Sequence, residues 1–242
     1  MKSHVSLLSH TPMPEMLAEI SAALCTSGKS INGAIMNASD GLLRNILASG
    51  HESVIEHVSF TFGIEGVSRS FLAQITRHRL ASFSVQSQRY VEQDEFDYIT
   101  PPKIEKDSYL RGLFDATMNQ MNENYKELSS YLNEWYIHQG MDKKEARTKA
   151  LEDARFVLPN ACETKMIVTM NARELRHFFR LRCCKRAQWE IRGVALEMLE
   201  LVKEVAPILF EDAGAPCVCG KCPEGKLSCG QPYSKIESAK EE

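Results

Sequence analysis

VSFTFGIEGVSRSFLAQITRHR, residues 58–79, joins two hydrophobic patterns on which the fold depends. From Val58 to Ile64 every second residue is apolar, and this period of two is typical of a half-buried strand. From Val67 the apolar residues recur at every fourth position, which predicts a short helix that reaches about His78. The stretch therefore predicts a strand, then a helix, then a group of basic residues.

Outward from this stretch, most periodic segments are helical. The longest apolar stripe covers residues 107–138, and a second helix follows between Asp142, with Glu145 as a capping-box partner, and Pro159. A further helix is predicted to start at Asn171, a favourable N-cap with Glu174 at the third position, and its apolar stripe continues to Pro207. Strands are expected near residues 5–9 and 166–170, and an extended or loop-like segment over 82–90. The predicted class is α+β, mostly helical.

Composition excludes several classes of protein. The chain has 242 residues, 43% of them hydrophobic, with 29 basic and 32 acidic residues and a net charge of −3. This balance argues against disorder and against a dedicated nucleic-acid binder. No apolar run approaches the roughly 20 residues that cross a bilayer, and the apolar core within residues 1–12 is too short for a signal peptide. We therefore expect a cytoplasmic protein without a membrane or nucleic-acid partner.

The local distribution of charge is more informative than the net charge. Residues 66–90 contain no acid, and residues 171–192 contain seven bases against two acids. Arginine is well suited to bidentate recognition of phosphate, and residues 77–79 precede a stretch rich in hydroxyl and amide groups. The pattern indicates a nucleotide or flavin site. For residues 171–192 a solvated helix face with surface ion pairs remains an equal alternative.

Spacing on the predicted helix adds a geometric expectation. Arg182 and Arg186 are four residues apart, as are Arg173 and His177, so each pair should share one helix face.

Four of the eight cysteines lie close together near the C-terminus, after a shift in composition at about residue 213. We therefore divide the chain into a catalytic domain, 1–213, and a Cys-rich tail, 214–242. The tail offers four soft ligands at short spacing, which favours a zinc knuckle over an unliganded tail or an iron–sulfur cluster. The candidate ligands are Cys217, Cys219, Cys222 and Cys229.

Arg77-His78-Arg79, followed by seven residues and Ser87, is similar to the RHR-x7-S signature of the flavin-dependent thymidylate synthases. The resemblance extends over roughly residues 5–210. Its other segments occur in the family's order at residues 51–57, Gln74, 154–159, 171–173, 181–182 and 187–191.

The resemblance implies the family's fold, with a small central antiparallel or mixed sheet, and a transferase of nucleotide biosynthesis. The implied reaction methylates dUMP to dTMP, with 5,10-methylenetetrahydrofolate as carbon donor and NADPH-reduced FAD as hydride source. It also implies a homotetramer whose active sites are shared between subunits. The alternative from another class is a flavin- or nucleotide-binding or RNA-contacting module with a zinc knuckle.

The resemblance also assigns residues to ligands. FAD would be held by His51, Ser53, Arg77, His78, Arg79, Val85, Asn171, Ala172, Arg173 and His177. The dUMP contacts would be Gln74, Ile75, Thr76, Arg77, Val85, Gln86, Ser87, Gln88, Arg89, Arg155 and Arg182. Arg182 is the candidate catalytic residue, because a guanidinium at the uracil edge stabilises negative charge that develops in the ring. Ser87 has no evident base beside it, so we expect it to bind rather than to attack.

Three positions depart from the family pattern. Val85 stands where the family commonly has Glu, Arg186 where some members have His, and His177 where some have Asn. The contacts at these positions are therefore expected to differ from those of other members.

Overall fold

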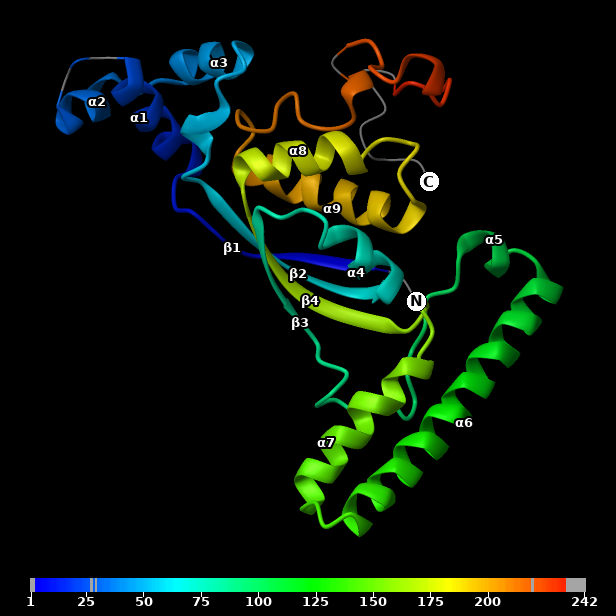
Figure 1. The fold of residues 1–242 in the computed structure, drawn as a ribbon. Helices are drawn as coiled ribbons and strands as arrows, with labels where there is room; N and C mark the ends of the chain where they lie inside the picture. Colours follow the sequence, from blue (N-terminus) through cyan, green and yellow to red (C-terminus); the bar gives the residue numbers. More distant parts are fainter. Residues whose placement is uncertain (1–2, 27, 29, 219, 234–242) are drawn as a thin grey trace. The chain divides into compact units, whose positions relative to one another are not determined.

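The computed structural model describes residues 3–26, 28, 30–218 and 220–233. By its internal contacts the chain forms two compact units. We call them the α6–α7 unit, residues 65–73 and 84–166, and the α8–α9 unit, residues 3–64, 74–83 and 167 onward. Figure 1 labels the elements of both units. No helix in the part of the chain that the structure describes is both long and apolar enough to cross a membrane.

A four-stranded antiparallel sheet has the strand order β1-β2-β4-β3. The strands are β1 (His4–His10), β2 (Ser59–Ser68), β3 (Ala81–Val85) and β4 (Glu163–Asn171). The apolar alternation in β2 corresponds to burial, since Phe60 and Phe62 are fully buried. The strands predicted from residues 58–64, 5–9 and 166–170 are thus confirmed, as is the α+β class.

The α6–α7 unit is dominated by a helical hairpin (Figure 1). Asp107 accepts hydrogen bonds from the first backbone amides of α6, and Asp142 does the same for α7, which confirms both predicted starts. Tyr125 of α6 packs against Leu151 and Ala154 of α7 in a buried cluster. The helical elements that complete this region are α4 (Arg69–Ile75), α5 (Pro102–Glu105), α6 (Ser108–His138), α7 (Lys143–Ala154) and a 3₁₀ turn at Arg155–Val157.

In the α8–α9 unit, the predicted continuous helix from Asn171 to Pro207 is wrong. Helix α8 (Ala172–Arg182) ends and α9 (Trp189–Val205) begins after a loop over residues 183–188. Asn171 caps α8 as predicted, and the side chain of Gln188 accepts hydrogen bonds from the first amides of α9. Arg186 lies in the loop, so Arg182 and Arg186 do not share a helix face. Each helix has its own apolar stripe, and the short loop between them contains no Gly or Pro that would mark the break.

The first part of the α8–α9 unit is helical, which the sequence analysis did not predict. It contains α1 (Pro14–Thr26), α2 (Ile31–Asn37), α3 (Asp40–Ala48) and a 3₁₀ turn (Glu52–Ile55). The hydroxyls of Ser30 and Ser39 cap α2 and α3. The C-terminal segment, of which residues 214–218 and 220–233 are described, belongs to the same unit and contains 3₁₀ turns at Pro216–Val218 and Gly225–Leu227.

Candidate active site

The two units hold different shares of the predicted site. The α8–α9 unit contains the residues predicted for FAD except Val85, together with Arg182 and the dUMP candidates within 74–77. The α6–α7 unit contains the dUMP candidates of residues 85–89 and Arg155.

A buried hydrogen-bonded chain joins three residues of the α8–α9 unit. Arg182 Nε donates to His78 Nε2 over 3.1 Å, and His78 Nδ1 lies 3.0 Å from Glu174 Oε1. His78 and Glu174 are only 5% and 7% exposed. The ring of His78 also packs edge-on against Phe178, with 4.9 Å between centroids. The arrangement holds Arg182 by its Nε and leaves the two terminal nitrogens of the guanidinium for other partners.

The hydrogen-bond directions assign the protonation of His78. Guanidinium nitrogens only donate, so His78 Nε2 accepts and the ring proton is on Nδ1, directed at the Glu174 carboxylate. Burial lowers the pKa of His78 below its ordinary value, although the hydrogen bond to Glu174 acts in the opposite direction. The charge of Arg182 lowers it further. His78 is therefore neutral at pH 7, which suits its role as acceptor.

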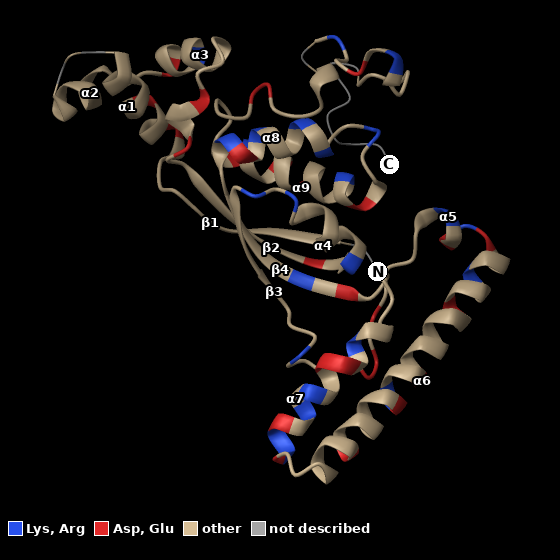
Figure 2. Cartoon of the chain, viewed as in Figure 1, with Lys and Arg blue, Asp and Glu red and all other residues tan. Residues whose placement is uncertain are grey.

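Positive charge accumulates beside this chain of contacts. Arg77 and Arg79 are exposed at the end of α4, and among the described residues neither forms an ion pair with a carboxylate. Burial and the charge of Arg77 lower the pKa of Arg182 from its usual high value. Figure 2 shows basic residues along α8 and in the loop that follows it. An anionic ligand could therefore contact Arg77, Arg79 and Arg182 without displacing a described carboxylate.

Two other arginines of α8, Arg173 and Arg176, form ion pairs within the chain. Arg173 pairs with Glu56, and Arg176 donates to Glu52 over 2.9 Å and to Asp212 over 2.6 Å. The surface ion pairs considered as an alternative for residues 171–192 therefore account for Arg173 and Arg176 but not for Arg182. The Glu52 contact also ties the predicted FAD segment at residues 51–53 to α8.

In the α6–α7 unit, Arg89 is the most informative of the predicted dUMP residues. Its Nε is buried and forms no hydrogen bond with any described residue. The Ser87 hydroxyl accepts a hydrogen bond from the Arg89 amide over 3.2 Å, and the Arg89 guanidinium contacts Glu152 at 3.4 Å. A buried donor without a partner is costly, so Arg89 is suited to an anionic ligand.

A second basic group lies in the same unit. The charge of Arg155 lowers the pKa of Arg69, in addition to a larger effect of burial. Burial raises the pKa of the Cys162 thiol to about 11 and outweighs the charge of the nearby Arg69, which lowers this pKa. Burial likewise raises the pKa of the Cys183 thiol, in the other unit, to about 12. Both thiols remain protonated at neutral pH and cannot act as nucleophiles.

The predicted zinc site receives no support. Within residues 3–26, 28, 30–218 and 220–233, no group of three or more His, Cys, Asp or Glu side chains is arranged to hold a metal ion. Cys217, Cys222 and Cys229 have free thiols, and Cys219 lies outside the described residues.

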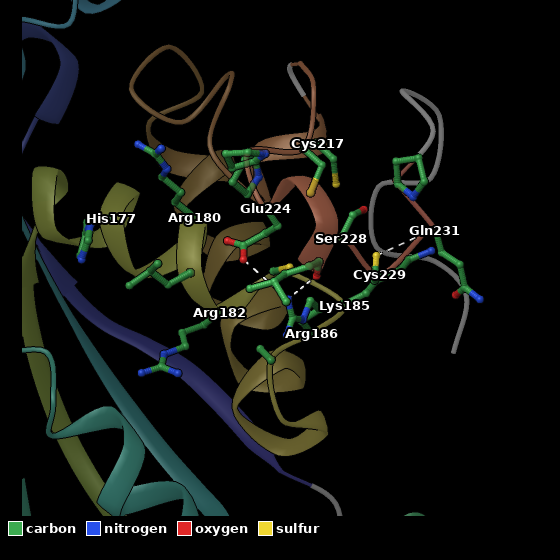
Figure 3. Close-up of a pocket in the computed structure, with 18 residues that line it drawn as sticks. His177, Arg180, Arg182, Lys185, Arg186, Cys217, Glu224, Ser228, Cys229 and Gln231 are labelled. Atoms are coloured by element: carbon green, nitrogen blue, oxygen red, sulfur yellow. Dashed lines mark hydrogen bonds and ion pairs between the residues drawn. The ribbon is translucent and has the colours of Figure 1, made fainter.

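The described cysteines of this segment, Cys217, Cys222 and Cys229, instead line a pocket of about 690 Å³ at the C-terminal end of α8. Its walls come from α8, the loop at 183–188 and the C-terminal segment, and include His177 and Arg182 (Figure 3). The sequence carries no local signal for this pocket, because its walls are distant in sequence and joined by tertiary contacts.

Comparison with known proteins agrees with the motifs. The family model described as "Thymidylate synthase complementing protein" matches residues 6–208. The chain is 53% identical over 231 residues to the flavin-dependent thymidylate synthase of Clostridium tetani, an alignment that covers 94% of this chain and 93% of the relative. The chain belongs to the flavin-dependent thymidylate synthase family. The enzyme of that name from Geobacter sulfurreducens is 48% identical over 233 residues, covering 94% of each chain.

Membership of the thymidylate synthase family also bears on the alternatives. The relative from Pyrococcus furiosus is 44% identical over 194 residues, and this alignment covers 76% of our chain and 73% of the relative. These relatives are named as enzymes, and the alternative of an RNA-contacting or nucleotide-binding module is not supported.

One residue of the site was missed. Glu174 was noted only for its capping position, because its partner His78 is 96 residues away and no local pattern connects them.

Proposed function

We propose that the chain converts dUMP to dTMP, with 5,10-methylenetetrahydrofolate as carbon donor and NADPH as reductant through FAD. One methylene group and one hydride become the new methyl group. The proton lost from C5 of uracil and one proton from solvent protonate the two folate nitrogens that release the methylene group. The products are dTMP, tetrahydrofolate and NADP⁺. The observation that carries the proposal is the chain Glu174–His78–Arg182, which fixes an arginine that forms no ion pair with any described carboxylate.

The residues of the α8–α9 unit fit FAD. Arg77 and Arg79 are exposed and form no ion pair with a described carboxylate, so they can meet the pyrophosphate. We propose that FAD also contacts His51, Ser53, His177 and residues 171–173. Bound FAD, once reduced by NADPH, supplies the hydride that completes the methyl group. His78 is too buried to present much surface to a cofactor, so we assign it to positioning Arg182.

For dUMP, we propose that Arg89 and Arg155 bind the phosphate. The unpaired Nε of Arg89 supports this, because a phosphate oxygen would satisfy it. The polar side chains proposed to contact the sugar and base of dUMP are those of Gln74, Ser87 and Gln88.

Arg182 is the proposed catalytic residue. Its terminal guanidinium nitrogens would donate to the O2/N3 edge of uracil, where negative charge develops when C5 becomes nucleophilic. Because Nε is already held by His78, the orientation of the guanidinium is set before the substrate binds.

We also propose a homotetramer with active sites shared between subunits. Large apolar side chains exposed on the first helices support association, because such a surface is costly in water. They include Met16, Leu24, Ile31, Ile35 and Met36.

The test is dTMP formation by the purified protein with dUMP, methylenetetrahydrofolate, NADPH and FAD, followed by omission of each component in turn. We expect no dTMP when dUMP, methylenetetrahydrofolate or NADPH is omitted. Omission of added FAD should leave slow turnover by protein that retains its flavin. Formation of dTMP without NADPH, or none in the complete mixture, would refute the proposal.

A further inference from the structure

The pocket at the end of α8 carries excess positive charge. Arg180, Arg182, Lys185 and Arg186 line it, and Glu224 is the acidic residue among its described walls. Figure 3 shows the basic side chains leaving α8 and the following loop in different directions rather than converging on one point. A pocket of about 690 Å³ is large enough for part of a small-molecule ligand.

The C-terminal segment forms one wall of this pocket through specific contacts. Arg186 donates to the carbonyl of Leu227 and lies 3.7 Å from the Glu224 carboxylate. The Tyr233 hydroxyl donates to the carbonyl of Cys183 over 3.0 Å, and Lys185 Nζ lies 4.7 Å from the centre of the Tyr233 ring. The wall is therefore held to the loop at 183–188 and is part of the α8–α9 unit.

No described carboxylate forms an ion pair with Arg180, Arg182 or Lys185. Arg180 is exposed, and no described carboxylate pairs with it. Lys185 likewise has only the Tyr233 ring as an electrostatic contact among the described residues. Among the described ion pairs, Glu224 partly neutralises Arg186, at 3.7 Å. The pocket thus favours an anionic ligand.

The arrangement favours several separated negative charges over one phosphate. A single phosphate is commonly bound at a helix N-terminus, but here Gln188 occupies the first amides of α9 and Asn171 those of α8. The remaining donors are side chains spread over α8 and the loop. A flexible chain of carboxylates could reach them one at a time.

The pocket also adjoins the proposed active site, since His177 and Arg182 belong to both. A ligand anchored at the flavin could therefore extend into it. We propose that this pocket binds the γ-linked oligoglutamate tail of the folate cosubstrate. The inference rests on the proposed function and identifies how that site distinguishes long-tailed from short-tailed folates.

The test compares methylenetetrahydrofolate monoglutamate and pentaglutamate as substrates of the FAD-loaded enzyme. We expect the KM for the pentaglutamate to be about tenfold lower at low salt, and the difference to shrink near 1 M salt, where the Debye length is about 3 Å. Arg180→Gln should reduce the ratio of the monoglutamate KM to the pentaglutamate KM by about three- to fivefold, since it removes a charge that contacts no described acid. Equal KM values in the wild-type enzyme would overturn the inference.

Two further variants sharpen the comparison. Lys221→Gln removes the same charge from an exposed position of the C-terminal segment outside the pocket, and it should leave the ratio of KM values unchanged. Glu224→Gln removes the acid that competes for Arg186 and should increase the preference for pentaglutamate about twofold. A decrease in Glu224→Gln, or an equal change in Lys221→Gln, would contradict the assignment.

The same measurements separate the possible sources of the anion. If Arg180→Gln weakens NADPH or FAD binding and leaves the folate ratio intact, the pocket takes a dinucleotide phosphate and the inference fails. If neither folate yields dTMP, the proposed function itself fails.

Discussion

Replacement of Glu174 by leucine tests whether the buried carboxylate positions Arg182. Glu174 is 7% exposed and accepts the Nδ1 proton of His78 at 3.0 Å. Leucine has a similar volume but no acceptor, so His78 would keep a buried donor without a partner. The Asn171 cap would persist, because it binds the backbone amide of residue 174. The substitution therefore removes one contact and leaves the start of α8 intact.

The magnitude follows from that contact. An unsatisfied buried donor costs about 1–3 kcal/mol of unfolding free energy. The imidazole can relieve this cost by turning, and Arg182 Nε then loses its acceptor. A guanidinium displaced by about 1 Å can lower the rate about 100-fold, so we expect kcat to fall by about 10- to 100-fold, or about 1.4–2.7 kcal/mol. The KM for dUMP should change less, because the lost interaction acts mainly in the transition state.

The assay is steady-state dTMP formation by flavin-loaded protein, with thermal unfolding measured in parallel. Glu174→Gln keeps an oxygen acceptor for His78 and should restore most of kcat. Asp212→Asn is the control, because it breaks the ion pair with Arg176 on the same helix without contacting His78. A folded Glu174→Leu enzyme with wild-type kcat, or an equal loss of kcat in Asp212→Asn, would refute the positioning role.

Three other predictions concern the same residues. Arg182→Ala should abolish dTMP formation while the protein still binds FAD and remains yellow, and activity above about a tenth of wild type would exclude it as the catalytic arginine. Arg89→Ala should raise the KM for dUMP by about 10- to 100-fold, as expected for the loss of a charged hydrogen bond. The control Arg147→Ala breaks the Arg147–Glu92 ion pair of the same unit and should leave this KM unchanged. The pH dependence follows from His78, whose pKa is lowered by burial, so the folded state favours the neutral imidazole. The stability that neutral His78 provides is present above the ordinary histidine pKa. It is lost as the pH falls through the lowered pKa of the folded state. The acid limb of kcat should follow this pKa and shift to lower pH in Glu174→Gln, because the carboxylate raises the pKa of His78; an unchanged acid limb would contradict the link.

Local signals in the sequence were sufficient for much of the fold. The alternation around Phe60 and Phe62 identified the buried strand, because side chains on a strand face opposite sides in turn. Asp107, Asp142 and Asn171 identified three helix starts, because a capping side chain acts within three residues of its own position.

Other features had no local signal. The break between α8 and α9 contains no Gly or Pro, and Gln188, which caps α9, is not among the residues preferred for capping. The contacts His78–Glu174 and Arg176–Glu52 join positions 96 and 124 residues apart, so they exist only once the chain has folded. The same is true of the pocket lined by the C-terminal segment.

The account depends most on where Arg182 lies when dUMP and FAD are bound. A crystal structure of the assembled protein with both ligands would show this directly. We expect the terminal nitrogens of Arg182 within hydrogen-bonding distance of the uracil O2/N3 edge, with His78 still accepting from Nε. A uracil ring bound elsewhere, with Arg182 directed into solvent, would contradict the account.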